Sequence, residues 1–137
     1  MSYGVSAALQ RAVFGQLAAD AGLAALVGPA IYDALPTGTL PPLYVVLGAE
    51  DVRDASDKTG AGAEHSFTVS IVTESAGFAT AKEAAAAVSD ALVDAALILD
   101  RGSLVSLNFY KAKAARVGTG SMRQINLIFR ARVADDT

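Results

Sequence analysis

The chain has 137 residues, of which 53% are hydrophobic and 18% are charged, and its formal net charge is −3. This composition predicts one folded domain, residues 1–137, with a sizeable core, and argues against disorder. The absence of cysteine excludes a disulfide framework and a thiolate metal site.

The first elements in chain order are helical. Apolar residues recur every four positions from Val5 to Leu17, which predicts an amphipathic helix. Gly22 indicates a break, and a short helical turn follows it. A short apolar stretch, Ile31–Tyr32, then leads into a linker from Pro36 to Pro42.

The segment Leu43–Leu47 is β-branched, aromatic and apolar at every position, which predicts a strand covered on both faces. Residues 48–62 are polar, acidic and rich in small side chains, and we expect a mobile loop or a protruding hairpin arm. Such a segment between two core strands favours a role in contacting partners. The candidate contact residues are Glu50, Asp51, Arg53, Asp54, Asp57 and Lys58.

The segment His65–Thr73 alternates between apolar and polar residues and predicts a strand. An alanine-rich helix follows, for which residues 80–83 match a capping box, although a start one turn earlier, near Gly77, is an alternative. The chain ends in a predicted β-hairpin with strands at 104–116 and 122–133 and its turn at 118–121.

These elements predict an α+β fold in the order α-β-β-β-α-β-β, with a long loop between the second and third strands. A mostly antiparallel five-stranded sheet with two helices on one face would bury both alanine-rich helical stripes. No internal repeat and no domain boundary interrupts this pattern.

The charges are distributed unevenly along the chain. Residues 1–100 hold four Lys/Arg against 12 Asp/Glu, whereas residues 101–137 hold seven against two. An acidic body and a basic C-terminal segment allow copies of the chain to bind head to tail, because opposite potentials attract across a contact. Alternatively, folding interleaves the two sets of charges and no patch survives.

The sequence offers no constellation for catalysis, and we expect no enzyme, cofactor or metal. His65 is the only histidine. It alternates in phase with the core residues of its strand, so we expect its side chain on the same face and a structural role for it. Asp51, Asp54 and Asp57 recur every third residue, but they lack the alternate oxygen ligands and closing glutamate of a calcium loop.

The C-terminal hairpin carries most of the basic residues. Its apolar and polar positions separate onto two faces, and a surface for self-association is the preferred interpretation of the charges. Direct DNA binding is the alternative, against which the acidic chain and the few interleaved aromatic residues argue. The candidate subunit-interface residues are Lys111, Lys113, Arg116, Arg123, Arg130 and Arg132.

The order and spacing of several segments resemble the tail terminator, or tail completion, proteins of tailed bacteriophages. The segments are Ala30–Pro36, Pro42–Gly48, the strand from His65, the alanine-rich helix and the final hairpin. The chain is most similar to the version carried by the gene transfer agents of alphaproteobacteria, which are phage-derived particles.

The resemblance implies an α+β fold and a structural role. It implies a hexameric ring that caps the tail tube, ends polymerisation of the major tail tube protein and joins the tail to the head-side connector, with DNA passing through its channel without specific binding. A head-side stopper ring and a small DNA-binding protein are the alternatives. No apolar run is long enough for a membrane span, and the N-terminus lacks a secretory signal. We therefore expect assembly in the cytoplasm and a final location in the tail of the released particle.

Overall fold

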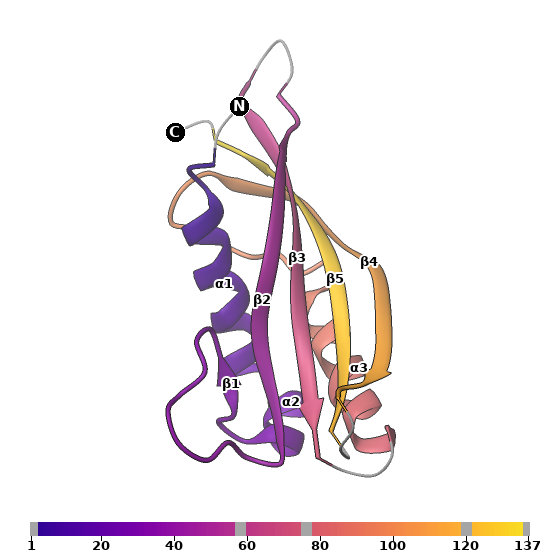
Figure 1. The fold of residues 1–137 in the computed structure, drawn as a ribbon. Coiled ribbons are helices and arrows are strands. Elements are labelled where there is room, and N and C mark those ends of the chain that lie inside the picture. Colours follow the sequence, from indigo (N-terminus) through magenta and orange to yellow (C-terminus); the bar gives the residue numbers. More distant parts are fainter. Residues whose placement is uncertain (1–2, 57–59, 75–77, 119–121, 136–137) are drawn as a thin grey trace.

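The computed structural model describes residues 3–56, 60–74, 78–118 and 122–135. Within these ranges the chain forms an α+β fold, as predicted, with three helices and five strands (Figure 1). In chain order they are α1 (Ser6–Ala19), α2 (Ala21–Val27), β1 (Ile31–Tyr32), β2 (Leu43–Asp54), β3 (Gly62–Thr73), α3 (Ala79–Leu92), β4 (Ser103–Arg116) and β5 (Arg123–Ala134).

The strands form one sheet in the order β1-β2-β3-β5-β4. The pairs β2–β3, β3–β5 and β5–β4 are antiparallel, whereas β1 runs parallel to β2. The sheet is therefore mixed, because the short β1 follows α2 and enters beside β2 in the same direction. The final strand, β5, lies between β3 and β4 and contributes to the centre of the core.

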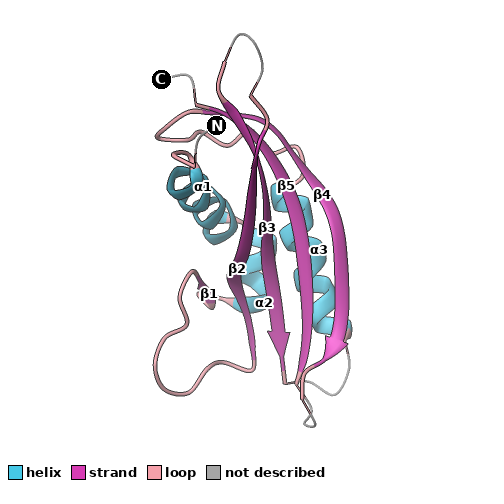
Figure 2. Ribbon diagram, turned by 45° about the horizontal axis from the view of Figure 1, so that its top comes forward, coloured by secondary structure: helices cyan, strands magenta, loops and turns pink. Residues whose placement is uncertain are grey.

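Three helices cover one face of the sheet, and the prediction of two helices is wrong in this respect (Figure 2). The additional helix, α2, begins because Asp20 turns the backbone to an extended conformation and its carboxylate accepts a hydrogen bond from the Leu23 N–H at 2.9 Å. This cap satisfies a free N–H at the new helix start. The break thus falls at Asp20, and Gly22 lies inside α2.

The core lies between the helices and the sheet. Leu17 of α1, Ile71 of β3 and Phe129 of β5 are fully buried there. The predicted stripe of α3, represented by Ala84 and Val88, is also fully buried. Because alanine has no side chain beyond Cβ, this helix can approach the sheet closely.

The start of α3 differs from the predicted capping box. The cap residue is Phe78, which makes no side-chain capping hydrogen bond, and Thr80 already lies inside the helix. Gly77, the alternative start, lies outside the described residues.

Residues 48–62, for which the expectation is a mobile loop or a protruding hairpin arm, lie largely in the β2–β3 hairpin, which agrees with the arm and not with a long loop. β2 continues to Asp54 and pairs with β3 as far as Ala63, which leaves only residues 55–61 as the connection. A bulge between Leu47 and Glu50 inserts one extra residue into β2 and breaks the alternation that indicates a strand in a sequence. Asp57 and Lys58 lie outside the described residues.

The two margins of the sheet remain partly uncovered within the described chain. β1 pairs only with Val45 and Val46 of β2, so that no strand lies beside Leu47–Arg53 on that side. At the opposite margin, the Asp94 N–H bonds to the Leu107 carbonyl at 3.1 Å, and beyond it no described strand lies beside Asn108–Arg116.

Candidate functional site

Four of the predicted interface residues share the face of the sheet that carries no helix. Arg130 and Arg132 lie on β5 at positions that alternate with the buried Phe129 and Ala131. The other two are Lys111 and Lys113 of β4, which pair with residues of the same helix-free side, Ile128 and Asn126. We call Lys111, Lys113, Arg130 and Arg132 the basic strip.

The other two predicted interface residues do not join this strip. Arg116 of β4 and Arg123 of β5 are paired across the two strands. Both lie on the same face of the sheet as the buried Ile125, which faces the helices. The Arg123 guanidinium lies over the Phe78 ring, 5.4 Å from its centroid. The structure therefore divides the six candidates between the two faces of the hairpin.

Arg130 lies in a pocket of about 360 Å³ on the helix-free face. Its guanidinium stacks 3.5 Å from the centroid of the Tyr110 ring, a geometry that favours a cation on an aromatic face. Its Nε is buried, lies 3.9 Å from Glu64 Oε1, and makes no hydrogen bond to the described residues. Glu64 also forms an ion pair with Arg53, in which Arg53 Nη2 lies 3.0 Å from Glu64 Oε1.

The interleaving of opposite charges, which is the alternative to separate charged surfaces, is thus found at Glu64, which lies between arginines of β2 and β5. It does not extend to the margin of the sheet. Lys111 and Lys113 have no ion pair within the described chain, and the Lys111 ammonium lies 5.6 Å from the centroid of the neighbouring Tyr110 ring. A positively charged margin therefore remains on β4.

The candidate residues of β2 have different surroundings. Asp51 is exposed and has no ion pair or hydrogen bond within the described part of the chain. Arg53 is paired with Glu64, and Asp54 accepts hydrogen bonds from the backbone and hydroxyl of Ser56. Those bonds hold the pKa of Asp54 below its usual value.

Glu50 faces the helices and forms a polar cluster with His65, which the sequence did not reveal. His65 is fully buried, as its parity predicted, and its Nδ1 lies 2.9 Å from Glu50 Oε2. Tyr3 and Ser6 both donate hydroxyl hydrogen bonds of 2.8 Å to Glu50 Oε1. The bulge at 48–49 hid this cluster, because it moves Glu50 onto the parity of the core.

Partial burial of Glu50 raises its pKa, but hydrogen bonds from His65, Ser6 and Tyr3 outweigh this effect. The net result is a pKa below the usual glutamate value, because the bonds favour the charged carboxylate. The carboxylate therefore ties the N-terminal segment to the β2–β3 hairpin.

The cluster does not have the order of a nucleophile–base–acid triad. A triad requires the serine to bond to the imidazole, which in turn bonds to the carboxylate. Here Ser6 bonds to the Glu50 carboxylate itself, and the buried Nε2 of His65 has no hydrogen-bond partner among the described residues. The arrangement fits a structural anchor.

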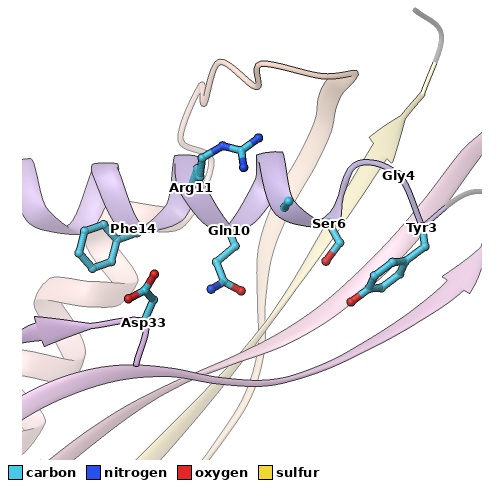
Figure 3. Close-up of a pocket in the computed structure, with 8 residues that line it drawn as sticks. Tyr3, Gly4, Ser6, Gln10, Arg11, Phe14 and Asp33 are labelled. Carbon is cyan, nitrogen blue, oxygen red and sulfur yellow. The ribbon is translucent and has the colours of Figure 1, made fainter. Parts of the chain in front are cut away.

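An open groove of about 760 Å³ lies beside α1. Figure 3 shows the side chains of Gln10 and Phe14 directed from α1 toward Asp33, which follows β1. Tyr3 and Ser6 also line the groove and are bonded to Glu50 of β2. The groove is thus lined by α1, the segment before it and Asp33, and it adjoins β2 through the hydrogen bonds of Tyr3 and Ser6 to Glu50.

Within the described ranges, no group of three or more His, Asp or Glu side chains is placed to hold a metal ion. Nor does any helix in these ranges combine the length and apolar character needed to cross a membrane.

Comparisons with known proteins agree with the resemblance noted in the sequence. A family described as Tail completion protein gp17 matches residues 11–134. A solved structure described as the virion of a native gene transfer agent (GTA) particle contains a chain that is 65% identical, with a TM-score of 0.93. The alignment covers 97% of this chain and 99% of that one. No curated protein matches the sequence.

Proposed function

Because the chain belongs to the Tail completion protein gp17 family, we propose that it forms a hexameric ring that caps the tail tube of a phage-like particle. The ring ends polymerisation of the tube and joins the tail to the head-side connector, and DNA passes through its channel without specific binding. The match to a chain of a gene transfer agent virion over almost the full length of both proteins carries this proposal.

The surfaces described above suit a structural protein. A ring of identical subunits needs two different surfaces that meet after a fixed rotation. The basic margin at Lys111 and Lys113 and the acidic Asp51 at the opposite margin supply such a pair. The buried His65 cluster and the absence of a triad geometry favour an anchoring role over catalysis.

Deletion of the gene tests the proposal. Electron microscopy of particles from the deletion strain should show overlong tails or tails without heads, since nothing ends the tube or connects it. A plasmid copy of the wild-type gene should restore particles of normal length. Normal particles that still transfer genes in the absence of the protein would contradict the proposed function.

The position in the particle distinguishes a terminator from a head-side stopper. A small epitope tag at the C-terminus, visualised with gold-labelled antibody on purified particles, should mark the end of the tail tube. Labelling of the head neck above the tail junction would instead support the stopper.

A further inference from the structure

We propose that the ring forms by strand pairing between copies: the open margin of β4, Asn108–Arg116, pairs antiparallel with the open margin of β2, Leu47–Arg53, in the next copy. This inference rests on the proposed ring and specifies its subunit contact. The partner is a second copy of this chain, and the contact continues one sheet into the next.

The first support is that each copy has two different open margins. An uncovered edge strand presents unpaired N–H and C=O groups that are ready to bind another strand. β1 covers only Val45 and Val46 of β2, and the segment at Asp94 covers β4 only as far as Leu107. The remaining parts of both strands are long enough for a ladder of several hydrogen bonds.

The second support is the direction of the strands. β2, β3, β5 and β4 are antiparallel in succession, so β2 and β4 run in opposite directions at the two margins. Rotation about an axis roughly parallel to the strands preserves the direction of each strand. β4 of one copy and β2 of the next are therefore antiparallel, and the alternation continues across the contact.

The third support is charge. The open part of β4 carries Lys111, Lys113 and Arg116 and no acidic residue. The open part of β2 carries Glu50 and Asp51 and one basic residue, Arg53, whose charge is paired with Glu64 of the same copy at 3.0 Å. Like charges on directly opposed strands are destabilising, and opposite charges are favourable. Pairing of β4 with β4 is thus disfavoured, whereas pairing of β4 with β2 places the lysines near the exposed Asp51, and the contact becomes one between unlike margins.

The fourth support is the shape beside β2. Ala112 and Ala114 of β4 pair with the inward-facing Leu127 and Ile125, yet both alanines are exposed. The groove of about 760 Å³, lined by α1, the segment before it and Asp33, leaves room for such small side chains beside α1 of the next copy. Association would bury this exposed apolar surface.

Disulfide trapping tests the pairing, because the native chain contains no cysteine. Asp51→Cys is combined in turn with Asn108→Cys, Lys111→Cys and Lys113→Cys, all on the helix-free side, so that the register is scanned. Within one copy β2 and β4 are three strand spacings apart, about 14 Å, whereas a disulfide needs Cα atoms within about 7 Å. A disulfide in these variants therefore joins two copies.

Purified particles carrying each variant are oxidised and analysed by gel electrophoresis without reductant. At least one double variant should give a ladder of covalent multimers up to six chains. The single-cysteine variants should remain monomeric. The control, which combines Asp51→Cys with Thr80→Cys on α3, should also remain monomeric. Dimers from a single-cysteine variant would indicate a symmetric contact and overturn the proposal.

The remaining outcomes also separate the two proposals. Particles that contain the protein but give no multimer with any double variant overturn the strand pairing and leave the ring intact. Particles that never contain the wild-type protein overturn both proposals.

If the cysteine variants fail to enter particles, an exchange of charges between the two margins tests the pairing instead. Lys111→Asp and Asp51→Lys should each reduce incorporation about tenfold or more, and their combination should restore it. Failure of the combination to restore incorporation overturns the pairing.

Discussion

Glu50 joins the N-terminal segment to the β2–β3 hairpin through one carboxylate. It accepts hydrogen bonds from Tyr3 and Ser6 and contacts the buried imidazole of His65. We expect Glu50→Ala to lower the free energy of unfolding by about 1–3 kcal/mol, because the buried imidazole loses its partner. Denaturant titration measures this change. Asp51→Ala, at an exposed neighbouring position, is the control and should change stability by less than about 0.5 kcal/mol.

The same carboxylate makes stability depend on pH. Since the pKa of Glu50 is lower in the folded protein than its usual value, its contribution is fully present above the usual value and is lost as the pH falls through the lowered pKa. The difference in unfolding free energy between the wild type and Glu50→Gln should therefore shrink as the pH falls through this range. A difference that stays constant from neutral to acidic pH would contradict the assignment.

Gly102 is required by the backbone where the chain enters β4. Its φ is +71°, and a Cβ there would lie 2.5 Å from the Ala134 carbonyl oxygen. Gly102→Ala should lower the free energy of unfolding by about 1–3 kcal/mol, since both the conformation and the space exclude a side chain. Gly15→Ala is the matched control. Gly15 is exposed in α1 with open space around it, so that alanine should stabilise the protein by about 0.5–1 kcal/mol in thermal or denaturant unfolding.

At the scale of elements, α3 depends on small side chains where it meets the sheet. Ala84 is fully buried, whereas Ala86 on the same helix is exposed. We expect Ala84→Leu to lower the free energy of unfolding by about 1–3 kcal/mol through overpacking. Ala86→Leu should be within about 0.5 kcal/mol of the wild type. Equal effects of the two changes in denaturant titrations would show that α3 does not pack through its alanine stripe.

The elements also show where patterns in the sequence succeed. The alternation in β5 places Ile125, Leu127 and Phe129 on one face, and all three are buried as predicted. In β2 the alternation fails at the bulge near Gly48. The sequence pattern therefore predicts only a loop or a hairpin arm where the second half of this strand lies. A bulge moves every later residue of the strand to the opposite face. A search for strict alternation therefore does not recognise the second half of such a strand.

At the scale of the whole molecule, the ring contact proposed here needs space beneath α1 of a neighbouring copy. Ala114 is exposed on β4, and Ala114→Trp should leave the stability of the isolated chain within about 0.5 kcal/mol of the wild type. It should nevertheless reduce incorporation into particles about tenfold or more, since in the proposed contact position 114 lies next to a neighbouring copy and an indole is far larger than the methyl group of alanine. Ala86→Trp, on the exposed side of α3, is the control and should enter particles normally. Quantitative immunoblots of purified particles measure both.

The sequence by itself determined the α+β class, the strands of the core and the faces of the final hairpin. These features follow from local periodicity, since each residue's environment repeats along a helix or strand. The tertiary structure alone decided the parallel entry of β1, the contact between Glu50 and His65, and the division of the basic residues between two faces. These depend on which distant segments meet and on a bulge that shifts the register, and neither is encoded in local alternation.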